Sequence, residues 1–307
     1  MRDGVAIAAA GLTKRYGERL AVDHVDFELP VGVVGGFVGP NGAGKTTTIR
    51  MLLGLIHPTS GTAHVLGHPV TDPAGYLARV GALIEAPAFY PTLSGRRNLE
   101  VLSRLGRLDR ARLGEVLATV GLTDRADDVV RSYSLGMRQR LGVAAALLPD
   151  PELVILDEPA NGLDPSGIRE IRTLLRGIAD RGMTVFVSSH LLAEIQAICD
   201  HLVMIDHGHI VFQGKIDELL ASQRPELLAT PEHSKDLDTL AHLCTASGHG
   251  ARLDGERVRV QAPEEWAAEL NRRAMAAGIT LRGLRCERRS LEEAYFSITE
   301  HPSEPGA

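Results

Sequence analysis

The sequence predicts an α/β domain that contains a helical subdomain, followed by a small α+β domain. Three observations support this prediction. A glycine-rich loop with the pattern G-x-x-x-x-G-K-[ST] follows an apolar stretch, a second apolar stretch ends in two carboxylates, and the C-terminal part alternates strands and helices in the order β-α-β-β-α-β. Apolar strands alternating with helices are typical of α/β folds, and the last order is typical of a ferredoxin-like domain.

The glycine-rich loop spans residues 39–46 and fits its pattern at every position. Residues 33–38 ahead of it are apolar and β-rich, and a helical pattern follows it, which is the setting that the motif requires. Its three glycines let the backbone wrap around an anion, which the helix N-terminus also favours. The motif predicts a nucleotide-phosphate site in which Lys45 reaches the β- and γ-phosphates and the Thr46 hydroxyl is a ligand of Mg²⁺. The loop residues expected to bind ATP are Gly39, Pro40, Asn41, Gly42, Ala43, Gly44, Lys45, Thr46 and Thr47.

Short strands are expected at residues 5–9 and 20–29, with Tyr16 between them. The ring of Tyr16 could stack on a base. Because Tyr16 comes just before a glycine turn, the local sequence alone favours the alternative that it is an ordinary aromatic residue in a turn. Apolar and charged residues then alternate at helical spacing, which indicates a helical subdomain at about 93–148. The expected strands before it are 62–66 and 80–85, and its expected helices are 97–105, 110–120 and 135–148.

The second apolar stretch, residues 153–158, ends in Asp157 and Glu158. Carboxylates at the C-terminal end of a strand lie where open α/β sheets bind ligands. The alternative is that these two carboxylates are simply solvated at the end of a strand. A phosphate loop upstream in the same chain disfavours that alternative. We therefore expect Asp157 to be the partner of Mg²⁺, directly or through water, and Glu158 to polarise an attacking water.

A helix is expected at residues 165–179, with Asp164 as its N-cap and proline at its first position. A strand at 184–188 then leads to His190, followed by a helix at 191–199.

A hairpin with strands at 202–205 and 210–213 comes next. The spacing of His201, His207 and His209 could suggest a metal site. The Asp-x-Gly turn at residues 206–208 and the lack of a nearby fourth ligand favour the hairpin instead.

The C-terminal domain is expected at residues 226–300, after a first domain at 1–221 and a linker at 223–225; residues 301–307 are expected to be a tail. Its expected strands are 226–230, 250–253, 257–261 and 280–286, and its expected helices are 235–245, 264–277 and 291–298.

Composition limits the possible functions. The net charge of −6 gives no basic field, which argues against nucleic acid as the main partner. The three cysteines are far apart and form no ligand spacing or disulfide framework, which fits a reducing cytosol. No run of about 18 apolar residues and no signal-peptide pattern occurs, so we do not expect the chain to span a membrane by itself.

Residues 133–142, Tyr-Ser-Leu-Gly-Met-Arg-Gln-Arg-Leu-Gly, come directly before the acidic strand. Together with the phosphate loop and that strand, they resemble the ATP-binding cassette (ABC) ATPases, a P-loop NTPase fold, over residues 5 to about 220. Within that family the chain looks most like the bacterial drug-resistance and bacteriocin-immunity exporters of the bacitracin and daunorubicin type. Residues 290–296, Ser-Leu-Glu-Glu-Ala-Tyr-Phe, resemble the accessory domain that many of these carry.

The resemblance implies a role for each matching residue. Tyr16 becomes the aromatic that stacks on adenine, which reverses the preference from local residues alone. Glu158 becomes the catalytic base, and His190 the switch histidine that contacts the γ-phosphate and holds the water. Asp164 would cross a dimer interface, and Ser134 and Gly136 would bind the γ-phosphate of ATP held by the opposite subunit.

Two motifs depart from the family pattern. The usual Leu-Ser-Gly-Gly-Gln reads Tyr-Ser-Leu-Gly-Met at residues 133–137, which keeps the serine and the second glycine. The usual glutamine after the strand at 80–85 is Glu85, whose carboxylate could approach Mg²⁺ or simply face solvent or an arginine. The loop at 86–93 is, by resemblance, where a membrane subunit docks.

The resemblance therefore implies an ATP-binding and ATP-hydrolysing subunit that forms a homodimer. It would lie at the inner face of the cell membrane, on the cytoplasmic side, and power export of a drug, antibiotic or peptide through a separate transmembrane permease. A nutrient importer is an alternative that the C-terminal domain and the altered signature disfavour. A soluble ABC ATPase acting on ribosomes or DNA is another, disfavoured by the single phosphate loop, the lack of room for long coiled coils and the negative charge.

Overall fold

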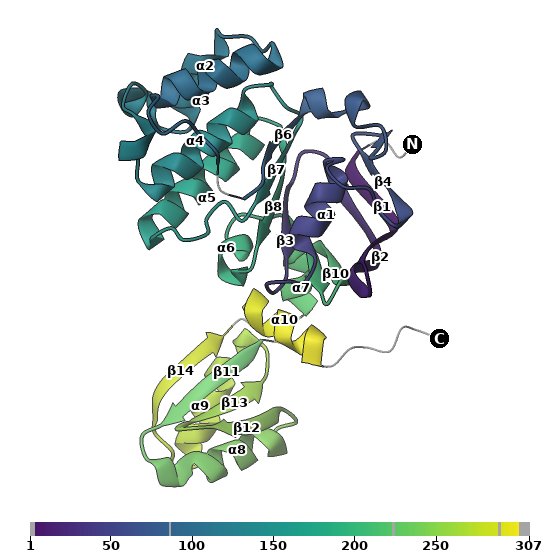
Figure 1. The fold of residues 1–307 in the computed structure, drawn as a ribbon. Coiled ribbons are helices and arrows are strands. Elements are labelled where there is room, and N and C mark those ends of the chain that lie inside the picture. The colour runs from purple at the N-terminus through teal and green to yellow at the C-terminus, as the bar shows by residue number, and fades with distance from the viewer. Residues whose placement is uncertain (1–3, 86, 223–224, 288–289, 301–307) are drawn as a thin grey trace. The chain divides into compact units, whose positions relative to one another are not determined.

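The computed structural model describes residues 4–85, 87–222, 225–287 and 290–300 (Figure 1). The chain forms two compact units, Met1–Ile216 and Asp217–Ala307, so the division comes a few residues before the expected boundary at 221. No helix in the described ranges is long and apolar enough to cross a membrane.

The first unit is built on a six-stranded sheet with the strand order β10-β9-β3-β8-β7-β6. Neighbouring strands from β9 to β6 are parallel, and β10 pairs with β9 as an antiparallel hairpin. Strands β3, β7 and β8 are buried along their whole length, as parallel strands covered on both faces require. The strands are β3 (Val34–Val38), β6 (Val80–Leu83), β7 (Leu153–Asp157), β8 (Thr184–Ser189), β9 (His201–Asp206) and β10 (His209–Lys215).

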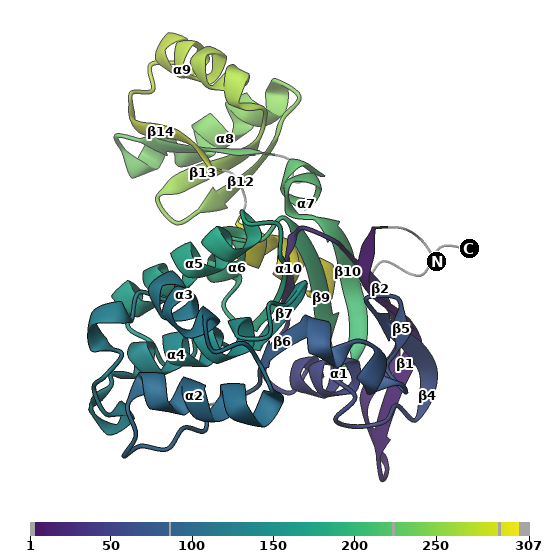
Figure 2. The ribbon, with the colours of Figure 1, turned by 90° about the horizontal axis from the view of Figure 1, so that it is seen from above.

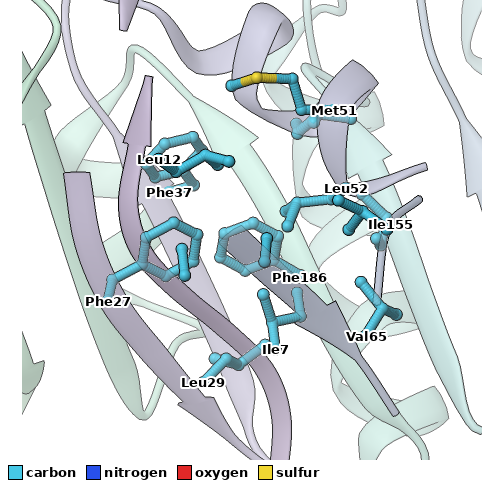
Figure 3. Packing of buried hydrophobic residues seen from close by; sticks show 14 of the residues in the cluster. Ile7, Leu12, Phe27, Leu29, Phe37, Met51, Leu52, Val65, Ile155 and Phe186 are labelled. Atoms are coloured by element: carbon cyan, nitrogen blue, oxygen red, sulfur yellow. The ribbon is translucent and has the colours of Figure 1, made fainter. Parts of the chain in front are cut away.

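A second, antiparallel sheet packs against this one in the order β2-β1-β4-β5. Phe27 of this sheet stacks with Phe37 and Phe186 of the first sheet, with ring centroids 5.8 and 6.1 Å from its own, and Phe37 and Phe186 are 5.3 Å apart (Figure 3). Met51 and Leu52 of helix α1 (Lys45–Leu52) complete this core. The strands are β1 (Val5–Tyr16), β2 (Arg19–Pro30), β4 (Ser60–Val65) and β5 (His68–Pro69).

The helices of the first unit lie on and beside the six-stranded sheet (Figure 2). A serine caps the N-terminus of two of the helices in the expected helical subdomain: Ser94 accepts from Arg97 N, and Ser134 accepts from Met137 N. The helices are α2 (Gly95–Gly106), α3 (Arg112–Thr119), α4 (Leu135–Leu147), α5 (Pro165–Ala179) and α6 (Leu192–Gln196). Helix α7 (Ile216–Ser222) follows β10, and only its first residue belongs to this unit.

The second unit is a four-stranded antiparallel sheet in the order β12-β13-β11-β14. Its element order is β11-α8-β12-β13-α9-β14, followed by α10, which confirms the ferredoxin-like prediction. Leu227, Val258 and Val260 of the sheet pack against Leu240 and Leu270 of the helices. The elements are β11 (Glu226–Pro231), α8 (Leu237–Ala246), β12 (Gly250–Asp254), β13 (Arg257–Gln261), α9 (Ala267–Ala276), β14 (Leu281–Glu287) and α10 (Leu291–Glu300).

The structure differs from the sequence prediction mainly in the lengths of elements. The first strand reaches Tyr16 rather than residue 9, because its pairing with β2 continues through several register shifts to the Tyr16–Arg19 pair. The helix expected at 191–199 is limited to Leu192–Gln196. Part of the expected linker, residues 223–224, and the expected tail, 301–307, lie outside the described residues.

Candidate active site

The phosphate loop joins β3 to α1, and two of its glycines adopt a left-handed backbone. Gly42 has φ 83° and Gly44, the residue before α1, has φ 114°. A Cβ atom on Gly44 would lie 2.6 Å from Ala21 O, and one on Gly39 would lie 2.1 Å from Ile205 O. Larger residues therefore do not fit at either position, and the loop conformation depends on glycine.

Lys45 and Thr46 point from the start of α1 toward the acidic end of β7. Lys45 Nζ donates to Gly39 O at 2.6 Å and to Pro40 O at 3.2 Å, and it lies 3.3 Å from Glu158 Oε1. The Thr46 hydroxyl donates to Asp157 Oδ2 at 2.7 Å. The two motifs that the sequence places far apart thus meet at one point.

Asp157 is the last residue of β7 and is held by Ser188, its partner in the parallel register with β8. The Ser188 hydroxyl donates to Asp157 Oδ1 at 2.5 Å and accepts from Glu158 N at 2.9 Å. The sequence analysis missed this role of Ser188. The available signal was a serine near the end of an apolar strand, two residues before His190.

Glu158 and His190 form a hydrogen-bonded pair. His190 Nδ1 lies 2.7 Å from Glu158 Oε2, and both side chains are partly buried. Glu158 has φ 51°, a left-handed conformation that is strained for a residue with a side chain. Such strain is found at functional sites, where the surrounding hydrogen bonds hold the backbone in place.

A cleft of about 550 Å³ contains most of these groups. Tyr16 lies on its wall with 48% of its surface exposed, and Lys14 Nζ lies 5.2 Å from the ring centroid. Arg19 and Asn161 were not singled out from the sequence, although Arg19 follows the Tyr16 turn directly. The lining residues are Tyr16, Arg19, Ala21, Asn41, Gly42, Gly44, Lys45, Thr46, Thr47, Glu158, Asn161 and His190.

Ser134, Gly136 and Asp164 are not among the residues that line this cleft. Ser134 caps α4, next to Gly136 in its first turn. Asp164 caps α5, where the backbone N–H of Gly167 and the Ser166 hydroxyl hold the pKa of its carboxyl below the ordinary value. These residues therefore mark a second surface at the N-termini of two helices.

Glu85 forms an ion pair with Arg50, and its side chain is 64% exposed. This is the arginine alternative that the sequence left open, and the Mg²⁺-facing role of Glu85 stays a prediction. At His201, His207 and His209 the sequence favoured a hairpin over a metal site, and His209 pairs with Asp206 across the turn, which confirms the hairpin. Within the described ranges, no group of three or more His, Cys, Asp or Glu residues could hold a metal ion.

The fold and the site together define the class of protein. A glycine loop at a helix N-terminus provides a cradle for nucleotide phosphates, and a carboxylate paired with a histidine lies at the rim of the same cleft. These features are those of a phosphate-loop ATPase.

Comparison with known proteins identifies the family. The model of the ABC transporter family matches residues 22–161. The chain is 38% identical to the bacitracin transport ATP-binding protein of Bacillus licheniformis, over 95% of this chain and 96% of that protein. It is 34% identical to the daunorubicin/doxorubicin resistance ATP-binding protein of Streptomyces peucetius, over 97% and 94%.

A solved structure of an ATP-binding subunit of an ABC transporter superposes with a TM-score of 0.63 at 28% identity, covering 71% of this chain and 92% of that one. The chain belongs to the ABC transporter family, as an ATP-hydrolysing subunit of the bacitracin and daunorubicin exporter type.

Proposed function

We propose that this subunit powers the export of a drug, antibiotic or peptide through a separate transmembrane permease. The observation that carries the proposal is the extent of similarity to the bacitracin and daunorubicin resistance proteins, which includes the C-terminal domain. The solved ATP-binding subunit covers only 71% of the chain. No comparison favours a nutrient importer over an exporter.

Mg²⁺ fits the donor atoms at the meeting point of the two motifs. The Thr46 hydroxyl and the Asp157 carboxylate offer oxygen ligands only, and their oxygens lie 2.7 Å apart. Magnesium is usually held by one or two such groups together with substrate phosphates, so a cage of three or more protein ligands is not required. When bound there, the ion would neutralise phosphate charge during hydrolysis of ATP.

The protein's own residues would divide the hydrolytic step between them. When the triphosphate enters, Lys45 turns from Gly39 O and Glu158 toward the phosphate oxygens. Glu158 is then free to accept a proton from the attacking water, and His190 holds Glu158 in place through Nδ1. The leaving group is ADP, and the terminal phosphoryl group is transferred to the water oxygen.

A second subunit would complete each site. Ser134, Gly136 and Asp164 lie at the starts of α4 and α5, outside the cleft that holds the phosphate loop. Backbone N–H groups at a helix N-terminus favour an anion, so the Ser134 end of α4 suits the γ-phosphate of ATP on an opposing copy. We infer a homodimer that ATP closes and hydrolysis loosens.

The permease would dock at the loop ending at residue 93. Ala86 lies outside the described residues. Further along the loop, Asn98 accepts from Tyr90 N and donates to Tyr90 O and Leu93 O. Tyr90 keeps 61% of its surface exposed. A loop that is hydrogen-bonded to Asn98 and exposes an aromatic side chain suits a contact surface, and it would bring the subunit to the inner face of the membrane.

Replacing Glu158 by Gln tests the proposed role of Glu158 in hydrolysis and the proposed ATP-induced dimer. Loss of a general base is expected to lower the turnover number by roughly 10²–10⁴ while ATP still binds and induces dimers. Glu115→Gln, at an exposed position on α3, is the control and is expected to behave as the natural protein. Unchanged hydrolysis in Glu158→Gln would remove Glu158 from its role.

The same Glu158→Gln protein, tagged and trapped with ATP, is then recovered from gently solubilised native membranes. A multi-span protein recovered in stoichiometric amount, identified by mass spectrometry, is expected. Recovery of ribosomal proteins instead would overturn the transport proposal and leave only the ATPase.

A further inference from the structure

A small, partly open cavity of about 20 Å³ lies beside the segment that carries His190. Its walls are mostly apolar and come from α5, β8 and α6, including Ile171, Leu175 and Ile195. Its polar lining residues are Arg172, Ser188, Ser189 and Glu194. A cavity of this size holds one water molecule, provided that polar partners are available.

Ser189 and Glu194 have complementary hydrogen-bonding needs. Glu194 Oε1 is fully buried, and no group among the described residues donates to it. The Ser189 hydroxyl, on a residue that is only 6% exposed, accepts from Leu191 N at 3.0 Å, and within the described part of the chain its own proton has no acceptor. One group needs a donor and the other needs an acceptor, so a single water between them would satisfy both.

The charges of the proposed catalytic pair, Glu158 and His190, act on the carboxyl of Glu194. Burial raises the pKa of Glu194, and the charge of Glu158 raises it further, whereas His190 and Arg172 act in the opposite direction. A buried carboxyl oxygen without a hydrogen bond is costly, which makes a water partner in this cavity favourable.

We propose that Glu194 is a positioning residue for the hydrolytic step, and that it holds one water in this cavity together with the Ser189 hydroxyl. This proposal rests on the proposed roles of Glu158 and His190. Ser189 and Leu191 flank His190 and are joined by a hydrogen bond, and Glu194 N donates to Leu191 O at 3.1 Å. The water would join Ser189 to Glu194 and so hold the segment between them, which keeps His190 Nδ1 at 2.7 Å from Glu158 Oε2.

The test uses the full chain and four variants: Glu194→Ala, Glu194→Gln, Ser189→Ala and the double alanine variant. Glu194→Ala and Ser189→Ala are each expected to lower kcat by about tenfold with an unchanged KM for ATP, because a misplaced catalytic group slows the reaction without weakening binding. The double variant should be no slower than the slower single variant, since both remove the same water. Glu194→Gln retains an acceptor oxygen and should keep most of the kcat. Glu115→Ala is the control.

A crystal structure of the natural protein should contain a water within hydrogen-bond distance of Glu194 Oε1 and Ser189 Oγ. The proposal is overturned if the effects of the two alanine variants multiply, if kcat is unchanged in Glu194→Ala, or if Glu194→Gln is as slow as Glu194→Ala. A raised KM at unchanged kcat also overturns it. Glu158→Gln distinguishes failure of this inference from failure of the proposed function. If Glu158→Gln is inactive while Glu194→Ala has normal activity, only the role of Glu194 is wrong. If Glu158→Gln is active, the proposed catalytic roles are wrong.

Discussion

Ser188 joins the proposed metal ligand to the proposed base, so Ser188→Ala is a direct test of how the site is held together. The substitution removes a hydroxyl that donates to Asp157 Oδ1 and accepts from Glu158 N, at a side chain with no exposed surface. Among the described residues, the Asp157 carboxylate then keeps only its hydrogen bond with Thr46. The backbone N–H of Glu158 loses its partner in a strained left-handed conformation.

The expected loss of stability follows from these two contacts. A hydrogen bond to a charged group contributes about 1.5–3 kcal/mol, and a buried donor left without a partner costs about 1–3 kcal/mol. The Glu158 N–H lies near the cleft, where water can partly replace the hydroxyl, so we expect about 3 kcal/mol in total. For a domain of this size that loss lowers Tm by roughly 6–12 °C. We expect kcat to fall roughly 10–100-fold, because Asp157 is no longer fixed.

Thermal unfolding followed by circular dichroism and steady-state ATP hydrolysis measure the two effects. Thr173→Ala is the matched control, because its hydroxyl is exposed and bonds only within its own helix, to Arg169 O. It should change stability by less than about 0.5 kcal/mol. A Tm for Ser188→Ala within the range of the control, together with normal hydrolysis, would show that Ser188 does not support the site.

Three further predictions concern the loop, the core and the metal. Gly44→Ala should weaken ATP binding by about tenfold or more, measured by titration with a fluorescent nucleotide, because its Cβ would meet Ala21 O and its backbone is left-handed; unchanged affinity would contradict this. Burial raises the pKa of Tyr76 to about 12, so the stability that its neutral phenol contributes is present below about pH 10 and is lost as the pH rises toward 12. In urea unfolding, Tyr76→Phe should show a smaller alkaline decline than the natural protein, and an equal decline would refute the assignment. Chelation of Mg²⁺ should stop hydrolysis and added Mg²⁺ should restore it, whereas activity that persists in the chelator would exclude the proposed metal role.

Much of the fold could be predicted from local patterns. Strands β3, β7 and β8 are continuous apolar runs because both faces are covered, and α5 begins at Pro165 after an aspartate cap, as expected. The lengths of β1 and α6 could not be predicted in the same way. The extension of β1 to Tyr16 depends on pairing with β2 and on several register shifts, which leave no periodic signal along a single strand.

The individual groups of the site were easier to predict than the contacts between them. In the phosphate loop and at the end of the acidic strand, the residue types and their spacing alone predict which side chains bind phosphate or a metal ion. The bond between Ser188 and Asp157 depends instead on the order of strands in the sheet, because β7 and β8 are neighbours while β3 lies on the other side of β8. The pairing of Glu85 with Arg50 is likewise a tertiary contact that no local pattern reports.

This strand order also explains why one pair of strands carries most of the chemistry. In the register of β7 with β8, Asp157 lies directly opposite Ser188, so the chain beyond each strand leaves the sheet at the same edge. Glu158 follows β7 immediately and His190 follows β8 immediately, and their side chains meet at 2.7 Å. Parallel strands give this arrangement because their carboxyl ends coincide. A shift of one residue in this register would turn Ser188 to the opposite face and separate the metal ligand from its support, so the same pairing that builds the core also determines the geometry of the site.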